Sequence, residues 1–436
     1  MKESNNLKLG IIGLGYVGLP LLIAFSKFRK VYGYDLNKNR IKDLNNCIDY
    51  SNEVKKKEFN NLKNIYFTNK INELKNCNFY IICVPTPIYS NKNPDLSLLK
   101  LACSQVASII KDKDIVVFES TVYPGTTEEI CIPIIEKISN IQCIQNRNKN
   151  MISKGFHCGY SPERINPGDK KHTISNIKKV ISSSSKHSIK IINSLYLEIV
   201  KAGTYIADSI KVAEAAKIIE NTQRDLNIAL FNELSIIFDK LKINTHSVIK
   251  AASTKWNFIK YYPGLVGGHC IGVDPYYLTY KARMLGYNPK LILAGRSIND
   301  KMGKIIAGKI LSKIKEKKII KKKIKVLILG LAFKENCSDI RNSKVFDIVD
   351  ILQKKKYFLV HVYDPLVSKK AFVNVNKKFL LIKDLKKDYY DIIILAVAHK
   401  IFIKYGPKKI KACGKKNSIF FDVKSCFDEI YSDLRL

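Results

Sequence analysis

A cysteine set among glycines is the residue in this chain with the clearest character of a nucleophile. Cys270 lies in GLVGGHCIGVDPYY, which runs from Gly264 to Tyr277. A thiolate can add to a carbonyl carbon and form a covalent intermediate, so the stretch predicts covalent catalysis. A buried, unreactive cysteine beside a flexible turn fits the same residues. The stretch alone does not decide between these two interpretations.

A second chemical feature lies near the start of the chain. LKLGIIGLGYVG places Gly13, Gly15 and Gly18 behind an apolar run, and VYGYD ends at Asp35, about 20 residues later. In a strand–turn–helix, these glycines permit a tight turn, the approach of a pyrophosphate and close helix packing. Asp35 would accept hydrogen bonds from ribose hydroxyls, which favours NAD over NADP. An ordinary acid at a strand end is the alternative for Asp35.

Two polar residues are one turn apart in a long helical segment. Lys217 and Asn221 lie in EAAKIIENTQRDLNIALFNE, and residues four apart share one face of a helix. An ammonium and an amide on one helix face can stabilise a developing oxyanion. A solvated helix lysine is the alternative for Lys217.

Composition limits the class of protein. The 436 residues suggest two or three domains, and the 46% of hydrophobic residues is typical of a globular protein. No apolar run approaches the roughly 18 residues of a membrane span, and the polar start does not resemble a secretory signal. The 11 cysteines contain no Cys-x-x-Cys pair. We therefore expect reduced thiols and a cytoplasmic protein.

The formal net charge of +37 raises the question of a polyanionic partner. Lysine, isoleucine and asparagine are abundant throughout, which is typical of compositional drift, and no known nucleic-acid module is present. We therefore expect no nucleic-acid partner and no membrane partner. A basic, non-enzymatic binder of nucleic acid or membrane is the alternative of another class. The charge would still attract an anionic small molecule, such as a nucleotide sugar.

Strand-like and helical segments alternate at both ends of the chain, which predicts an α/β fold. We expect two doubly wound, Rossmann-like domains joined by a helical middle with a long central helix over about 206–241, followed by shorter helices to about Lys315. The predicted domains are 1–205, which carries the glycine-rich turn, 206–315, which is helical, and 316–436, which is the second Rossmann-like unit. NFYIICV, DIVVFEST and HCGYSPERINPGD place polar residues at strand ends, where open parallel sheets bind ligands.

With these segments in order, the chain resembles the UDP-glucose/GDP-mannose dehydrogenase family over almost its whole length. The resemblance rests on the motifs GIIGLGYVGLP, CVPTP, ESTVYPGTTEE, YSPERINPGD, EAAKIIENTQRDLNIALFNE, GGHCIGVDPYYL and GLAFKENCSDIRNSKV. SPERINPGDK and GLVGGHCIGVDPYY are most similar to the branch that acts on UDP-N-acetylhexosamines. The UDP-glucose branch has Phe-Gln-Lys-Asp after the cysteine, where this chain has Ile-Gly-Val-Asp.

The resemblance implies an NAD-dependent, four-electron oxidation of a sugar hydroxymethyl group to a carboxylate. The substrate would be a UDP-N-acetylhexosamine, with N-acetylglucosamine or N-acetylgalactosamine as the sugar, and UDP-glucose and UDP-N-acetylmannosamine are the alternatives. Cys270 would add to the intermediate aldehyde as a thiohemiacetal, whose oxidation leaves a thioester. We expect the surrounding glycines to leave room for a hexose against the backbone.

The resemblance also implies roles for the predicted domains. Residues 1–205 would bind NAD, 206–315 would form the dimer and 316–436 would bind the UDP-sugar. Lys217 and Asn221 would point at the reacting carbon, where the Lys217 ammonium would lower the pKa of the Cys270 thiol.

The resemblance implies further roles for residues around the cysteine. Glu163 matches the family's catalytic glutamate and would act as general base, although a loop acid paired with Arg164 is the alternative. Thr121 and Asp274 match residues that hold a water molecule. Asp274 precedes a proline and a helical run, so it could equally cap that helix. We interpret His269 as a packing or substrate-side residue.

The remaining assignments concern ligands and assembly. The predicted cofactor contacts are Gly13, Gly15, Tyr16, Val17, Gly18, Asp35, Arg40, Pro85, Thr86, Thr121 and Arg341. The predicted substrate contacts are Glu163, Arg164, Asn166, Lys217, Asn221, Gly264, Gly267 and Lys334, with Lys424 a weaker candidate. Tyr262 stands where relatives carry an arginine, which removes one expected contact. Lys38 and Arg40 leave some tolerance of a ribose phosphate open. We expect a homodimer and no metal site.

Overall fold

The computed structural model describes residues 6–51, 53–145, 154–164, 173–319, 321–367 and 379–436. The chain forms two compact units. Unit 1 comprises Met1–Glu220 and Tyr276–Tyr287, and unit 2 comprises Asn221–Pro275 and Asn288–Leu436. The predicted division into three domains stays a prediction, since the contacts group the chain in two.

Unit 1 is built on an eight-stranded sheet with the order β3-β2-β1-β4-β5-β6-β7-β8. Neighbouring strands are parallel except for β6 and β7, which are antiparallel. The strands are β1 (Leu9–Ile12), β2 (Val31–Tyr34), β3 (Ile65–Thr68), β4 (Phe79–Ile82), β5 (Ile115–Phe118), β6 (His157–Tyr160), β7 (Lys179–Ser183) and β8 (Thr204–Ile206). The order reverses at β1, which is where such sheets bind nucleotides.

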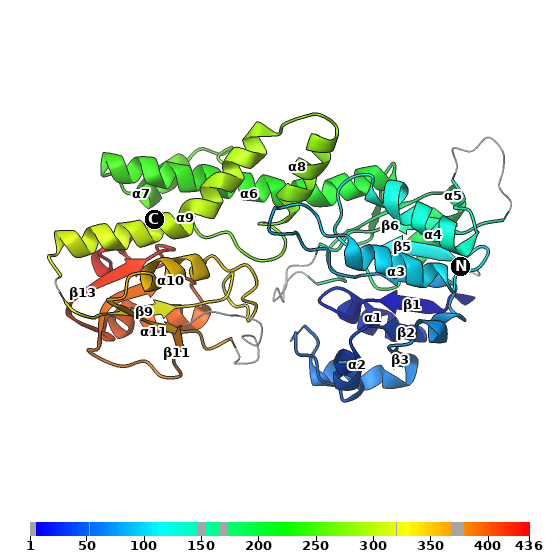
Figure 1. Cartoon of the computed structure of the whole chain (residues 1–436), viewed down its shortest axis with the longest axis horizontal. Helices are drawn as coiled ribbons and strands as arrows, with labels where there is room; N and C mark the ends of the chain where they lie inside the picture. Colours follow the sequence, from blue (N-terminus) through cyan, green and yellow to red (C-terminus); the bar gives the residue numbers. More distant parts are fainter. Residues whose placement is uncertain (1–5, 52, 146–153, 165–172, 320, 368–378) are drawn as a thin grey trace. The chain divides into compact units, whose positions relative to one another are not determined.

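Helices cover both faces of this sheet (Figure 1). They are α1 (Gly18–Ser26), α2 (Lys38–Asn45), α3 (Ser97–Ala107), α4 (Ile132–Ser139) and α5 (Lys186–Leu197), with short helical turns η2 (Lys56–Asn64), η3 (Ile71–Leu74) and η4 (Thr127–Cys131). Phe79, Ile81 and Val117 pack in one apolar cluster with α1 and α5. All residues of β1, β4 and β5 are buried, because both faces of these strands are covered.

Unit 2 contains a six-stranded parallel sheet with the order β11-β10-β9-β12-β13-β14. The strands are β9 (Ile324–Leu329), β10 (Phe358–Tyr363), β11 (Leu380–Leu381), β12 (Tyr390–Leu395), β13 (Gly414–Asp422) and β14 (Leu434–Arg435). Val326 and Ile328 pack with α9 (Lys290–Glu316) and α10 (Val345–Gln353), whereas Leu327 and Leu329 pack with α11 (Lys400–Lys411). This alternation along β9 shows that both faces are covered, and the predicted α/β fold with two doubly wound sheets is confirmed.

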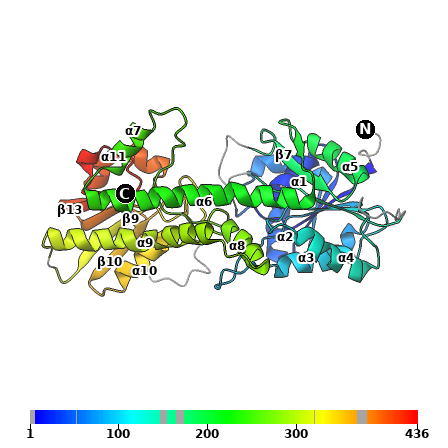
Figure 2. The same ribbon diagram turned by 90° about the horizontal axis from the view of Figure 1, so that it is seen from above.

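The middle of the chain is helical. It contains α6 (Ile210–Leu241), α7 (Thr245–Ala252) and α8 (Asp274–Met284), and a last helical turn, η6 (Glu429–Tyr431), lies near the C-terminus. The expectation of shorter helices after α6, up to about Lys315, is confirmed, since α9 has 27 residues against 32 in α6 and ends at Glu316. The glycines inside α9 weaken its helical signal, but Gly295 allows Leu226 of α6 to approach closely. Figure 2 shows this part of α6 in green beside α9 in yellow.

Candidate active site

The glycine-rich turn after β1 has the geometry that its sequence predicts. Gly13 has a φ of +90°, and a Cβ on Gly18 would lie 1.9 Å from the Gly13 carbonyl oxygen. Nothing lies within 4 Å of the Cβ position of Gly15. Val17 precedes α1 and provides no side-chain cap for its N–H groups. The turn therefore leaves open backbone beside Gly15 and helix N–H groups that suit a pyrophosphate.

Two charged side chains hold this turn from the protein side. Asp35 accepts hydrogen bonds from the Leu14 N–H at 2.9 Å and the Asn37 N–H at 2.9 Å. The buried Arg40 donates from Nε to the Leu14 carbonyl at 2.9 Å and from Nη1 to Asp49 at 2.8 Å. Arg40 Nη2 has no hydrogen-bond partner among the described residues. Cofactor contacts by Asp35 and Arg40 stay predictions, and these side chains also brace the turn.

The loops after β4 and β5 are tied together. Thr86 Oγ1 donates to the Thr121 carbonyl at 2.6 Å, and the Tyr277 hydroxyl donates to the Thr86 carbonyl at 2.6 Å. Glu214 on α6 accepts from the Thr127 N–H at 2.9 Å, and burial raises the pKa of this carboxyl to about 7. Pro85 belongs to the same loop as Thr86. The predicted cofactor residues from two strands therefore lie in one hydrogen-bonded assembly at the carboxyl edge of the sheet.

Glu163 follows β6 and is almost buried, with a side chain that is 13% exposed. Its Oε2 lies 3.2 Å from the Lys179 Nζ, and its Oε1 accepts from the Arg164 N–H at 2.6 Å. The Arg164 guanidinium pairs with Glu220 at 2.8 Å rather than with Glu163. The structure therefore does not support the alternative of an ion pair between Glu163 and the Arg164 guanidinium. Asn166 lies outside the described residues.

Lys217 on α6 is a nearly buried lysine. The residue is 8% exposed, and it has no hydrogen-bond or ion-pair partner among the described residues. A buried ammonium without a counter-charge is costly, so this arrangement suits a group that acts on a bound substrate. Burial also argues against a solvated helix lysine.

In unit 2, the loop that carries Cys270 is packed against the C-terminal sheet region. A Cβ on Gly267 would lie 2.7 Å from the Asn342 carbonyl oxygen, and one on Gly268 would lie 2.7 Å from the Phe333 ring. A Cβ on Gly264 would lie 2.9 Å from the Lys424 Nζ. The expectation that these glycines leave room for a hexose is therefore wrong. They are required because Phe333 and the Asn342 backbone fill that space.

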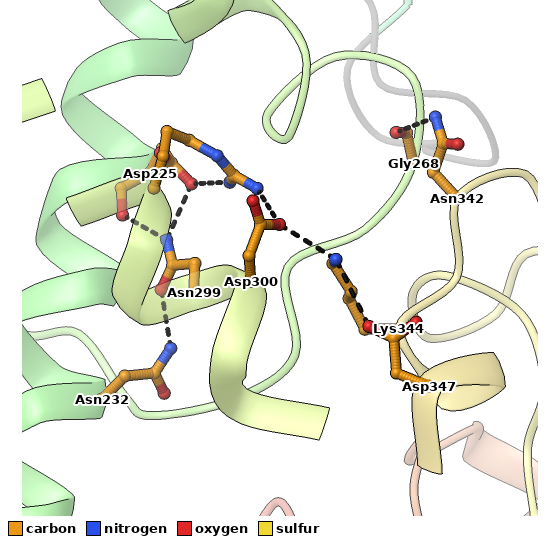
Figure 3. A network of polar contacts seen from close by, with 9 residues as sticks. Asp225, Asn232, Gly268, Asn299, Asp300, Asn342, Lys344 and Asp347 are labelled. Carbon is orange, nitrogen blue, oxygen red and sulfur yellow. Dashed lines mark hydrogen bonds and ion pairs between the residues drawn. The ribbon is translucent and has the colours of Figure 1, made fainter. Parts of the chain in front are cut away.

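Hydrogen bonds fix the same loop at two points. Asn232 on α6 accepts from the Gly264 N–H at 2.7 Å and donates to the Gly264 carbonyl at 3.0 Å. Asn342 donates from Nδ2 to the Gly268 carbonyl at 3.1 Å, as drawn in Figure 3. Because both ends are held, the backbone that leads to Cys270 has little freedom to move.

A polar network extends from Asn232 to α9 and α10 (Figure 3), and it is buried at Asn232 and Asn299 and partly exposed at Asp300. Asn232 donates to Asn299 at 2.8 Å, and Asn299 donates to Asp225 at 2.7 Å. Arg296 links Asp225 to Asp300, which also pairs with Lys344 at 2.9 Å. Hydrogen bonds among buried polar groups favour a single arrangement of the helices that carry them.

Asn221 and Asp274 meet in unit 2. Asn221 Nδ2 donates to Asp274 Oδ2 at 2.6 Å, and both side chains are buried. Asp274 begins α8, and its N–H donates to the Cys270 carbonyl at 2.8 Å. Asp274 is thereby held by both Asn221 and the cysteine loop. Its predicted roles in holding water and in capping α8 are compatible with this position.

Basic groups surround the same loop within unit 2. Arg341 forms a bidentate pair with Asp339, and its Nη2 lies 3.1 Å from His269 Nδ1. Burial alone would raise the pKa of Asp339, but the hydrogen bonds and charge of Arg341 hold it below the usual value. The Lys334 Nζ lies 5.6 Å from the centroid of the Phe333 ring. His269, a residue of this loop, thus contacts Arg341 and the Phe333 ring. Cofactor or substrate contacts by Arg341 and Lys334 stay predictions.

Family profiles match three consecutive parts of the sequence. They describe the NAD binding domain (residues 7–200), the central domain (211–301) and the UDP binding domain (327–429) of UDP-glucose/GDP-mannose dehydrogenases. The chain belongs to this family. It is therefore an NAD-dependent nucleotide-sugar dehydrogenase.

Relatives match nearly the entire chain. UDP-N-acetyl-D-glucosamine 6-dehydrogenases from Salmonella typhi and Pseudomonas aeruginosa are each 48% identical, over 99% of this chain and 99% or 100% of their own. Among solved structures, the UDP-D-ManNAc dehydrogenase from Pyrococcus horikoshii is 28% identical with a TM-score of 0.86, over 98% of both chains.

Sequence reasoning missed three residues of this dehydrogenase that hold predicted site residues in place, either directly or through a neighbour. Lys179 and Glu119 lie behind Glu163, and Asn232 holds the cysteine loop. Lys179 is one lysine among many in the chain, so its position in the sequence carries no signal. Asn232 follows Asn221 by 11 positions, or about three helical turns, which places both on one side of α6 and is the pattern that could have found it.

Proposed function

We propose that this dehydrogenase oxidises the 6-hydroxymethyl group of a UDP-N-acetylhexosamine to a carboxylate. The assignment of the substrate rests on the 48% identity, over 99% of this chain, to two enzymes named UDP-N-acetyl-D-glucosamine 6-dehydrogenase. The buried or half-buried positions of Cys270, Asn221, Asp274, Glu163 and Lys217 support the chemistry.

NAD, when bound, supplies the hydride acceptor for both oxidations. The open backbone at Gly15, the N–H groups of α1 and the Asp35 carboxylate fit its pyrophosphate and ribose. The 2'-phosphate of NADP would be repelled by Asp35. Tyr16, Val17, Pro85, Thr86 and Thr121 are proposed as further contacts of the cofactor.

The first oxidation converts the alcohol to an aldehyde, and the Cys270 thiolate then adds to the aldehyde carbon. Loss of a second hydride from this thiohemiacetal leaves a thioester. The Lys217 ammonium and the Asn221 amide would stabilise the oxyanion that forms at each stage. Glu163 would take a proton from the water molecule that hydrolyses the thioester, and Thr121 and Asp274 would orient that water.

NADH stoichiometry with each UDP-sugar tests this proposal. We expect two NADH per molecule of UDP-N-acetylglucosamine or UDP-N-acetylgalactosamine, and a lower kcat/KM with UDP-glucose and UDP-N-acetylmannosamine. Cys270→Ala should stop the reaction before acid formation. Two NADH per sugar from Cys270→Ala would contradict the covalent mechanism, and a preference for UDP-glucose would contradict the substrate.

The N-acetyl group is the feature that we propose the enzyme recognises, with Arg164 and Asn166 as its contacts. A buried donor left unpaired by UDP-glucose would cost roughly 1–3 kcal/mol, or about tenfold to a hundredfold in kcat/KM. Arg164→Ala should narrow the preference for the N-acetylated substrate. Lys178→Ala is a suitable control, because the contact of Arg164 with Lys178 is to the backbone carbonyl, which the substitution leaves in place. An unchanged preference in Arg164→Ala would remove Arg164 from this role.

We also propose that the enzyme is a cytoplasmic homodimer. Leu230, Ile237 and Leu241 of α6 are each about half exposed, and Trp256 is 92% exposed. An apolar helix face of this kind is buried when two copies pair around a two-fold axis. All 11 cysteines are thiols, which suits a reducing compartment. Among the described residues, no helix is long and apolar enough to cross a membrane. Light scattering that shows an active monomer would contradict the dimer.

A further inference from the structure

Three buried side chains form a hydrogen-bonded group next to Glu163, the predicted general base. The Lys179 Nζ at the start of β7 is 2.8 Å from Glu119 Oε2 and 3.2 Å from Glu163 Oε2. The Tyr196 hydroxyl on α5 donates to the other oxygen of Glu119. Lys179 therefore joins two carboxylates, of which one is Glu163.

The burial of this group is unusual for charged residues. Glu119 is 1% exposed, Lys179 is 6% exposed and Tyr196 is fully buried. Buried charges are retained only where they are paired, since water no longer solvates them. Burial lowers the pKa of Lys179, but the two carboxylates more than offset this and raise it, so the ammonium is kept at neutral pH. Glu119 has no part in the proposed reaction, which leaves its role to be explained.

Other ionisable groups face the same cluster. Burial strongly raises the pKa of the Cys83 thiol at the end of β4, so the thiol stays neutral. Burial likewise raises the pKa of Tyr196, which stays a hydrogen-bond donor. The Arg164 guanidinium is occupied by Glu220 of α6. Lys179 is in ion-pair contact with Glu163.

We propose that Lys179 is a positioning residue that holds Glu163 ionised and oriented for thioester hydrolysis, with Glu119 and Tyr196 fixing Lys179. This inference rests on the proposed function of Glu163 as general base. Lys179 holds one carboxylate oxygen, and the Arg164 N–H donates to the other. A carboxylate held at both oxygens presents its remaining lone pairs in a fixed direction.

The step that Glu163 would catalyse is hydrolysis of the thioester, and it needs no reactant other than water. Water adds to the thioester carbon as Glu163 takes its proton, and the C–S bond then breaks. The products are the sugar carboxylate and the Cys270 thiol, without oxidation or reduction. Lys179 keeps its proton throughout.

Lys179→Met tests the inference, because methionine is of similar length and has no charge. An opposite charge within about 4–6 Å lowers a carboxyl pKa by roughly one to three units, so its loss should move the acidic limb of the kcat–pH profile upward by about one unit or more. Because hydrolysis would become slow in Lys179→Met, we expect a rapid burst of two NADH per active site with this variant. Its intact mass should then show a covalent acyl-enzyme. Lys179→Arg should restore most of the wild-type behaviour.

A double variant separates positioning from folding. Lys179→Met alone leaves Glu119 buried without its partner, which would destabilise the fold. Glu119→Gln with Lys179→Met removes that unpaired charge, so its melting temperature should recover while the acyl-enzyme still accumulates. Glu119→Gln alone should leave the acidic limb unchanged or lower it. Arg29→Leu, which breaks the Arg29–Glu198 pair in the same unit, is the matched control and should not accumulate acyl-enzyme.

Glu163→Gln distinguishes an error in the role of Lys179 from an error in the role of Glu163. If Glu163→Gln accumulates the acyl-enzyme and the folded Lys179 variants do not, the role of Lys179 is wrong and the proposed function stands. If Glu163→Gln turns over without an acyl-enzyme, the assignment of Glu163 itself fails. An upward shift of the acidic limb in Glu119→Gln would also overturn the inference.

Discussion

Asn232 pairs with both the N–H and the carbonyl of Gly264, as one strand residue pairs with another. A side chain on a long helix thereby holds the first residue of the cysteine loop. Asn232 is fully buried, and its amide also reaches Asn299 on α9. The position of the loop is therefore linked to the packing of α6 against α9.

Asn232→Ala should lower kcat by about tenfold or more, because the loop that carries Cys270 loses its anchor. It should also lower the free energy of unfolding by roughly 1–3 kcal/mol, since the Gly264 N–H and carbonyl lose their partner. Steady-state kinetics and urea unfolding measure the two effects. Asn227→Ala, on the same helix but outside the network, is the control. Wild-type kcat in Asn232→Ala would contradict the link.

Gly267→Ala should destabilise the protein more than Gly264→Ala. The added methyl group meets the Asn342 backbone in the first case, and the flexible end of Lys424 in the second. Overpacking against backbone costs roughly 1–3 kcal/mol, whereas a lysine end can move aside. Thermal unfolding of both variants gives the comparison. Equal melting temperatures would show that the contact at Asn342 is easily relaxed.

Asp35→Asn should narrow the preference for NAD over NADP by about tenfold or more, because a like-charge contact with the ribose phosphate disappears. Asparagine retains an oxygen that can accept from the Leu14 N–H, so the glycine turn should keep its shape. The ratio of kcat/KM for the two cofactors is the measurement. Equal use of both cofactors by the wild-type enzyme would remove Asp35 from this role.

Asp364 should make unit 2 sensitive to acid. Burial alone would raise its pKa, but hydrogen bonds from His399 and from the Leu331 and Ala332 N–H groups hold it below 3.8. A lowered carboxyl pKa stabilises the fold above pH 3.8, and this contribution is lost as the pH falls through the folded-state pKa.

Asp364→Asn should therefore lower the free energy of unfolding by roughly 1–3 kcal/mol at pH 7, because buried N–H groups lose their acceptor. The difference from wild type should shrink below pH 3.8. Urea unfolding from pH 7 to pH 3 follows this change. Asp388→Asn, at an exposed turn, is the control. A difference that does not depend on pH would assign the effect to packing instead.

The sequence by itself determined what depends on neighbouring residues. Gly13, Gly15 and Gly18 specify the nucleotide turn because each acts through its own backbone or the adjacent helix. The long apolar pattern likewise predicts α6, since helical periodicity is local. The alternation of strands and helices predicts the α/β class for the same reason.

Only the tertiary structure decided which distant residues meet. Lys179 is 16 positions from Glu163 and 60 from Glu119, and no local pattern predicts their contact. The glycines near Cys270 suggest open space, but Phe333 and Asn342 from a separate part of the chain fill it. The glycines of α9 weaken its helical propensity, yet packing against α6 stabilises it over 27 residues. Burial and pairing of remote groups contribute more free energy than local propensity, so these features arise only once the chain has folded.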